Sequence, residues 1–216
     1  MTSDLNITGN DNKIILIKDG QEVPYESVKG LSIIVNGNSN TVKIELPSRF
    51  INTSIIMNGD NNYFSIKPTR HRYIRHTSFG MENGGIIEIG GGFSVYRNLN
   101  MVAKSGKKIT IGDECMFARE VIVRNNDGHT ITDTITGEIL NAPEDIKLHD
   151  KVWVGARTMI LKGTEIQTGS IVGAMSLVNK KFSEPNLLIA GVPANKIRGN
   201  VAWDRADFDN YVNKDI

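Results

Sequence analysis

The chain has 216 residues, a net charge of +1 and a single cysteine. This length suits one domain, and the balanced charge gives no electrostatic argument for binding nucleic acid or a membrane. One cysteine excludes an internal disulfide, and no apolar run approaches the length of a membrane span. Residues 1–20 lack the basic-then-apolar order of a signal peptide, so we expect a cytoplasmic location.

The first 84 residues are expected to form an N-terminal β region. Three similar asparagine-rich strings lie between apolar, β-branched stretches: Thr8–Asn12, Asn36–Asn40 and Asn58–Asn62. Asn-Gly strings between strands are typical of tight turns, so hairpins are one interpretation. Irregular coils stacked beneath a regular solenoid are the other, and we favour them because the string recurs with similar flanks.

A basic string follows, Arg70-His71-Arg72-Tyr73-Ile74-Arg75-His76. A run of this kind is more often a solvated face of the protein. The alternative is that it attracts an anionic glycan.

Residues 85–200 are dominated by an apolar period of six. The anchors are Leu148, Val154, Ile160, Ile166, Val172 and Val178, and the residues four positions after the first five are small or apolar: Val152, Thr158, Thr164, Ser170 and Ser176. Neither an α-helix nor a flat strand repeats at six, whereas hexapeptide repeats are the signature of a parallel β-helix. Three hexapeptides make one three-sided coil, so residues eighteen apart should stack, as Leu148 on Ile166 and Val154 on Val172.

Looser repeats extend the pattern toward the N-terminus. Their anchors are Ile89, Val95 and Met101, then Ile111, Phe117 and Val123. A polar loop insertion is expected at 125–145, and repeat proteins place insertions on the binding face. Cys115 takes a small inward position and should be a core thiol. Residues 201–216, with Trp203, should form a tail with a short helix that caps the open end of the solenoid.

Six segments resemble the hexapeptide-repeat, left-handed β-helix acetyltransferases, in that family's order: Ile111–Asp113, Asp127–His129, Val152–Gly155, Ile160–Gly163, Val172–Ala174 and Ala190–Ala194. They lie within residues 85–200. The stretch Phe182–Asn186, with Trp203 after it, is most similar to bacterial enzymes that O-acetylate sialic acid or capsular polysaccharide. The resemblance implies left-handed winding, a homotrimer, acetyl-CoA as donor and active sites between adjacent subunits.

Acyl transfer to a hydroxyl needs a base, and histidine has a suitable pKa. The resemblance places His129, in the polar insertion, at the catalytic position; the alternative is an ordinary loop histidine. A backbone carbonyl or Asp127 could orient its ring. Trp153 should point outward, and the resemblance puts it at the acetyl-transfer site, with trimer packing as the alternative. Backbone N–H groups near Gly155 and Ala156, or an indole N–H, could stabilise the oxyanion.

The resemblance implies coenzyme contacts at Ala156, Ala174, Asn179 and Lys180, and a phosphate contact at Arg198. Where the family often has another arginine, this chain has Asn195, and Lys196 could replace the missing charge. The alternative is that these cations form only a solvated basic edge. Asn100 falls near a position that contacts acceptor sugars in related enzymes.

We therefore expect an acetyl-CoA-dependent O-acetyltransferase acting on sialic acid or capsular polysaccharide, with His129 as general base in direct transfer. One alternative is N-acetylation of an amino sugar, often nucleotide-linked, or acetylation of a small molecule such as an antibiotic. Another is a β-helix scaffold that binds glycan without catalysis. No His, Cys or Asp cluster has zinc spacing, so we expect no metal.

Overall fold

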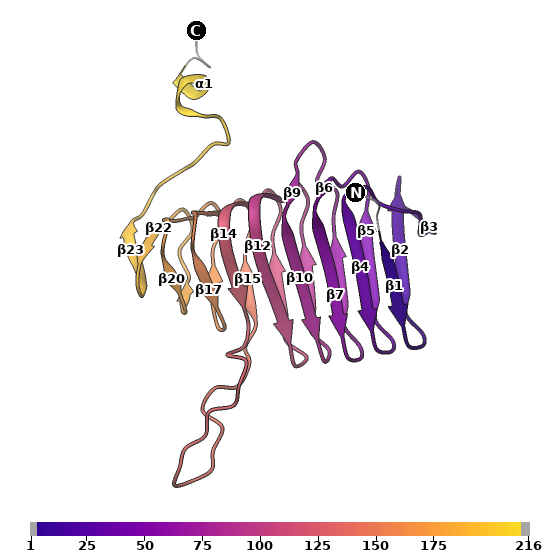
Figure 1. Cartoon of the computed structure of the whole chain (residues 1–216). Helices are drawn as coiled ribbons and strands as arrows, with labels where there is room; N and C mark the ends of the chain where they lie inside the picture. Colours follow the sequence, from indigo (N-terminus) through magenta and orange to yellow (C-terminus); the bar gives the residue numbers. More distant parts are fainter. Residues whose placement is uncertain (1–3, 213–216) are drawn as a thin grey trace.

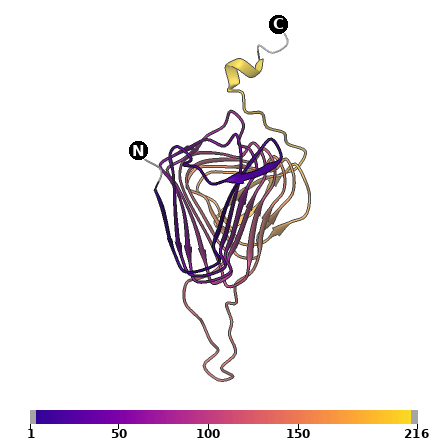
Figure 2. The ribbon, with the colours of Figure 1, turned by 90° about the vertical axis from the view of Figure 1, so that its right-hand side faces the viewer.

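The structure is a computed structural model that describes residues 4–212. In this range 23 β-strands and one short helix occur, and the strands stack as the coils of a solenoid (Figure 1). Figure 2, which looks along the stack, shows the coils nested behind one another. The expected parallel β-helix is confirmed, and its winding is left-handed.

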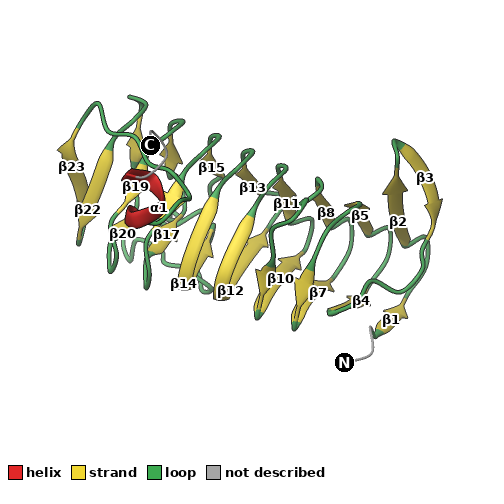
Figure 3. Cartoon of the chain, turned by 90° about the horizontal axis from the view of Figure 1, so that it is seen from above, coloured by secondary structure: helices red, strands yellow, loops and turns green. Residues whose placement is uncertain are grey.

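The strands of the coils fall into three walls. Figure 3 shows the successive coils side by side along the stack. The first wall holds β1 (Leu5–Thr8), β4 (Leu31–Asn36), β7 (Thr53–Asn58), β10 (Thr77–Glu82), the later parts of β12 (Ser94–Lys104) and β14 (Met116–Arg124), β17 (Met159–Leu161) and β20 (Leu177–Val178). The second wall holds β2 (Lys13–Lys18) with β3 (Gln21–Pro24), β5 (Thr41–Glu45), β8 (Tyr63–Ile66), β11 (Ile86–Ile89), β13 (Lys108–Ile111), β15 (Ile146–Leu148), β18 (Glu165–Ile166) and β21 (Lys181–Phe182). The third wall holds β6 (Phe50–Ile51), β9 (Ile74–Arg75), the early parts of β12 and β14, β16 (Trp153–Val154), β19 (Ile171–Val172), β22 (Leu188–Gly191) and β23 (Ala194–Arg198).

Inward side chains form continuous ladders because each strand pairs in register with the strand one coil away. The first-wall ladder is Ile33, Ile55, Phe79, Met101, Val123, Ile160 and Val178, all fully buried. The expected stacks of residues eighteen apart are confirmed on the other walls, where Leu148 pairs with Ile166 and Val154 with Val172. The period of six therefore marks the core.

The N-terminal strands continue the same solenoid. β4 pairs with β7 and β7 with β10 in parallel, so the strings at Asn36 and Asn58 are corners between walls rather than hairpins. The antiparallel β2–β3 pair is a hairpin beside these coils. Here Ile33 stacks on Ile55, so each coil is longer than the eighteen residues of three hexapeptides. The extra residues lie at the corners and hide the period of six.

Residues 125–145 form the insertion between β14 and β15. They leave the solenoid as an arm, which projects away from the coils in Figures 1 and 2. Within the arm, Thr132 and Ile139 form an isolated antiparallel bridge. We use "arm" for residues 125–145 below.

The tail takes a different course from the expected cap. The antiparallel β22–β23 pair forms the last edge, and residues 201–206, the strap, run back along the third wall. The helix α1 (Phe208–Val212) exists but buries no residue, so it covers no open end. Residues 213–216 of the expected tail lie outside the described range. No helix in the described chain is long and apolar enough to cross a bilayer.

Candidate active site

His129 lies at the base of the arm, just beyond the end of β14. Asn125 is buried there, and its amide pairs with the backbone of Lys104, whose N–H donates to Asn125 Oδ1 at 2.9 Å. Asn126 Oδ1 accepts the N–H of Gly128 at 3.0 Å, and Gly128 has a φ of 86°, which favours glycine. These bonds turn the chain out of the coil and leave His129 exposed.

Two residues that were not predicted from the sequence, Lys162 and Asn141, fix the root of the arm to the solenoid. Lys162 Nζ donates to Asp127 Oδ2 at 2.6 Å and to the carbonyl of Asn141 at 2.9 Å. Asn141 Nδ2 donates in turn to Asp127 Oδ2 at 3.0 Å and to the carbonyl of His129 at 2.8 Å. The hydrogen bond from Lys162 holds the pKa of the Asp127 carboxyl below its ordinary value. Asp127 thus binds Lys162 and Asn141 rather than orienting the ring of His129.

Trp153 lies on the third wall and points outward, as expected, with its indole half-buried. The strap covers part of it, because Trp203 is buried with its ring 6.0 Å from that of Trp153, centroid to centroid. Trp203 Nε1 donates to the carbonyl of Lys151 at 2.9 Å, which fixes the strap at this coil. Within one chain, Trp153 and His129 line different hollows that share no residue.

The expected coenzyme contacts fall at the two edges of the first wall. Ala156 and Ala174 lie on successive coils at the corner between the third and first walls, where the Met175 N–H donates to the Ala156 carbonyl at 2.8 Å. Among the described residues, the N–H groups of Ala156 and Ala174 donate no hydrogen bond, so both can serve a ligand. Gly155 differs from expectation: its N–H donates to Val172 at 2.8 Å and is not free for an oxyanion.

Asn179 and Lys180 lie at the other edge of the first wall, at its corner with the second wall. The arm leaves the solenoid at the same corner, two coils earlier. Lys180 Nζ donates to Asn195 Oδ1 at 2.6 Å. Lys196 is paired with Glu184 at 2.6 Å, so its charge is partly offset. Arg198 is exposed on β23 and has no carboxylate partner within residues 4–212.

The remaining candidates are separate from both edges. Asn100 is exposed on the first wall, in register with Ser78 and Ile122, and not beside Trp153. Cys115 is fully buried, and burial raises its pKa to about 12, so the thiol is unsuited to nucleophilic attack.

No protein-family model matches the chain. A polysialic acid O-acetyltransferase of Escherichia coli O1:K1 / APEC is 35% identical over 108 residues, half of this chain and 34% of that protein. Galactoside O-acetyltransferase of Escherichia coli (strain K12) is 34% identical over 53% of this chain and 55% of its own length. The chain therefore spans a third to about half of these curated relatives. A polysialic acid O-acetyltransferase of Neisseria meningitidis is 29% identical over 85% of this chain and 84% of its own.

Among solved structures, the polySia-specific acetyltransferase NeuO has a TM-score of 0.82 and 29% identity, over 95% of this chain and 90% of that one. The polysialic acid O-acetyltransferase OatWY matches the fold with a TM-score of 0.76, over 98% of this chain and 97% of that one. Fold and repeats thus define a left-handed β-helix protein of the hexapeptide-repeat class. Its homologues are named acetyltransferases, and the chain is similar in sequence and structure to acetyltransferases of this fold.

Proposed function

We propose that this protein is an acetyl-CoA-dependent O-acetyltransferase that modifies a sialic acid or capsular polysaccharide hydroxyl. The observation that carries the proposal is the arrangement of the first wall. One edge carries His129 and, two coils further on, Asn179 and Lys180. The other edge carries Ala156, with an open backbone N–H, three residues after Trp153 on the third wall. The names of the relatives support the acetyl donor and the glycan acceptor.

In this proposal the site forms between two copies of the chain in a homotrimer. The outward face of the first wall carries seven apolar side chains among polar ones such as Ser54, Ser78 and Asn100: Ile34, Ile56, Val102, Ile122, Met159, Leu161 and Leu177. Those of the second wall are mostly charged or polar: Lys43, Ser65, Glu88, Thr110, Lys147, Glu165 and Lys181. Burying the first wall against a copy would cover these apolar side chains and bring one edge of this wall close to the opposite edge of the wall in the copy.

The apolar arm supports the same assembly. Ile131, Ile135, Ile139 and Leu140 are between 54% and 93% exposed in the single chain. A projecting arm with four exposed aliphatic side chains is costly alone, and a neighbouring subunit would bury them.

The chemistry then needs one base and no acyl-enzyme intermediate. The acceptor hydroxyl oxygen attacks the thioester carbonyl carbon while the imidazole of His129 takes the hydroxyl proton. The tetrahedral intermediate collapses, the carbon–sulfur bond breaks, and the coenzyme thiolate leaves and takes up the proton. The open N–H of Ala156 or the indole N–H of Trp153 would stabilise the oxyanion.

Thiol release from acetyl-CoA tests this proposal, measured against sialic acids, polysialic acids, other capsular glycans and amino sugars. His129→Ala should lower turnover by about 10²- to 10⁴-fold and leave coenzyme binding intact. His149→Ala is the matched control, since His149 pairs with Glu165 on the outer face of the second wall. Turnover only on amino sugars would favour N-acetylation. A protein without turnover or coenzyme binding would be a scaffold instead.

A further inference from the structure

The third wall carries a hollow of about 410 Å³ beside Trp153. Its lining combines aromatic rings and cations: His71, Arg72, Tyr73, Arg75, Tyr96 and Arg205. Most of these belong to the basic string noted in the sequence, which the active site described above does not use. Two strands that lie coils apart, β9 and β16, therefore meet at one surface with Trp153 at its edge.

The cations of this hollow exceed its anions. Glu114, the acidic group beside it, pairs with Arg70 at 3.0 Å and with Arg205 at 3.7 Å. Within residues 4–212, Arg72 and Arg75 have no carboxylate partner, and the Nε of Arg72 is buried without any acceptor. Arginines held at a hollow without carboxylate partners favour the binding of an anion there.

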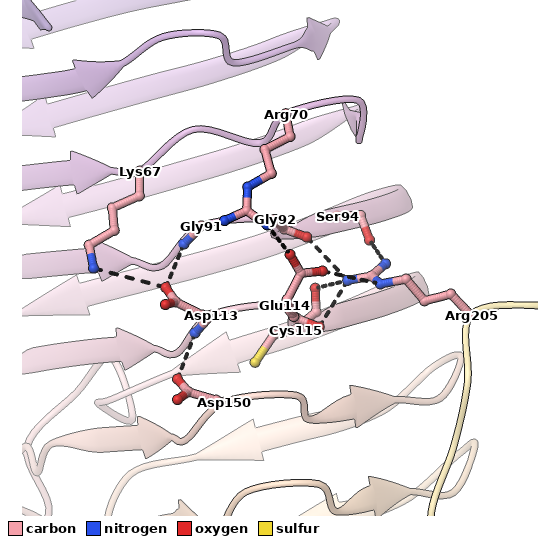
Figure 4. A network of polar contacts seen from close by, with 10 residues as sticks. All are labelled: Lys67, Arg70, Gly91, Gly92, Ser94, Asp113, Glu114, Cys115, Asp150 and Arg205. Atoms are coloured by element: carbon pink, nitrogen blue, oxygen red, sulfur yellow. Dashed lines mark hydrogen bonds and ion pairs between the residues drawn. The ribbon is translucent and has the colours of Figure 1, made fainter. Parts of the chain in front are cut away.

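Arg205 adds a guanidinium that is held in a fixed position beside this hollow. Its guanidinium donates to Ser94 Oγ at 2.7 Å and to the carbonyls of Gly92, Glu114 and Cys115 at 2.9–3.1 Å (Figure 4). Because these bonds hold it in place, it cannot swing away from Arg72. Burial lowers the pKa of Arg205, and the charge of Arg72 lowers it further. Two arginines that repel each other across a hollow favour an anion between them.

The hollow and the expected coenzyme contacts lie on opposite sides of Trp153. Toward the C-terminus, Trp153 pairs with Ile171 on the coil that carries Ala174. Toward the N-terminus it pairs with Met116, and Met116 with Ser94, which adjoins β9. Three strand spacings of about 4.8 Å give the hollow a reach of about 14 Å from Trp153. A donor thioester at Trp153 would thus meet an acceptor that extends along β9.

We propose that this hollow binds a carboxylate of an acidic saccharide acceptor, with Arg72 and Arg75 as the recognising groups. The inference rests on the proposed function and adds where the acceptor lies. The fork of a guanidinium matches a carboxylate in two parallel hydrogen bonds. The ring of Tyr73 lies 4.7 Å from the guanidinium carbon of Arg75 and positions that guanidinium at the hollow by a cation–π contact.

The test compares an α2,8-linked sialic acid oligomer with the same oligomer after its carboxyls are converted to methyl esters. Arg72→Gln and Arg75→Gln should each raise the KM for the acidic oligomer about tenfold, the cost of one charged hydrogen bond. The KM for acetyl-CoA, kcat at saturation and the KM for the ester should stay within about twofold. Arg97→Gln, exposed on β12 outside the hollow, is the matched control.

Direct binding of the acidic oligomer, measured by calorimetry, separates this inference from the proposed function. Binding that is lost in Arg72→Gln and kept in Arg97→Gln supports the site even if the protein turns over no acceptor. Arg72→Lys keeps the charge and loses the guanidinium fork, so it should bind the acidic oligomer with intermediate affinity. Its residual binding would show that a substitution at this position leaves the fold intact. Equal affinity in the parent and Arg72→Gln would overturn the inference. A raised KM for acetyl-CoA in place of the acceptor would assign the hollow to the coenzyme phosphates and overturn it too.

Discussion

Asn62 shows how a single buried amide holds a corner of the solenoid. It is fully buried, its Oδ1 accepts the N–H of Gly85 at 3.0 Å, and its Nδ2 donates to Asn40 Oδ1 at 2.9 Å. Asn62→Ala removes both side-chain hydrogen bonds from a buried corner and leaves a void there, so the free energy of unfolding should fall by about 1–3 kcal/mol in urea titrations. Asn38→Ala removes an amide on the exposed outer row of the same corner and should change it by less than about 0.5 kcal/mol. Equal losses would contradict the buried ladder.

Asp127 links the arm to the solenoid through a charge that depends on pH. Because its folded-state pKa is depressed, its contribution to stability is present above the ordinary carboxyl value of about 3.9 and is lost as the pH falls through the depressed value. In Lys162→Met the Asp127 carboxyl should titrate closer to the ordinary value, as NMR would measure. Lys147→Met, on the outer face of the second wall, should leave the Asp127 titration unchanged. An unchanged titration midpoint of Asp127 in Lys162→Met would show that Lys162 does not cause the lowered pKa.

Lys162 and Asn141 also mark what sequence reasoning can miss at this scale. Lys162 falls in Ile160–Gly163, a repeat segment that carries the family resemblance but predicts no role for this side chain. Its role depends on Asp127, which lies 35 residues earlier. No local pattern encodes that contact, since it exists only once the arm has left the coil. His129 could be predicted because it lies in a polar, glycine-containing insertion and because the family resemblance places it at the catalytic position; its catalytic role stays a prediction.

Among the elements, the strap packs against Trp153 and covers part of its indole. The chain has two tryptophans, so Trp203→Phe leaves Trp153 as the sole reporter. Adding Arg205→Ala to that variant removes four hydrogen bonds to the third wall and should release the strap. The emission of Trp153 should then shift to longer wavelength, because water reaches the indole. Arg97→Ala in the same background should not shift it, and an unshifted spectrum in the Arg205 variant would mean that other contacts hold the strap.

The elements also show why one half of the solenoid was easier to predict than the other. The period of six located inward residues such as Val154 and Ile166 directly, because each wall there is two or three residues long. In the N-terminal coils, asparagine corners lengthen each turn, and strand pairing rather than spacing identifies them. The strap was beyond prediction, since Arg205 contacts Ser94 across 111 residues.

At the scale of the whole molecule, the apolar side chains on the outward face of the first wall make assembly testable. Ile56 points outward from β7, in register with Ile34. Ile56→Asp places a charge on that face and should lower the mass in light scattering from three chains toward one, with loss of activity, while the circular dichroism stays that of a β-fold. Ser65→Asp, outward on the second wall, should leave the mass unchanged. A trimer that survives Ile56→Asp would require another interface.

If the site combines His129 of one copy with Trp153 of the next, two inactive variants should rescue each other. His129→Ala and Trp153→Ala are each expected to abolish most turnover. When they are unfolded and refolded together in equal amounts, an intact pair forms only where an intact His129 meets an intact Trp153 from the neighbouring copy. Random assembly restores roughly a quarter of the sites. The measurement is thiol release from acetyl-CoA in the mixture, against each variant refolded alone. A mixture no more active than its components would place both residues of a working site in the same chain, or remove one of them from it.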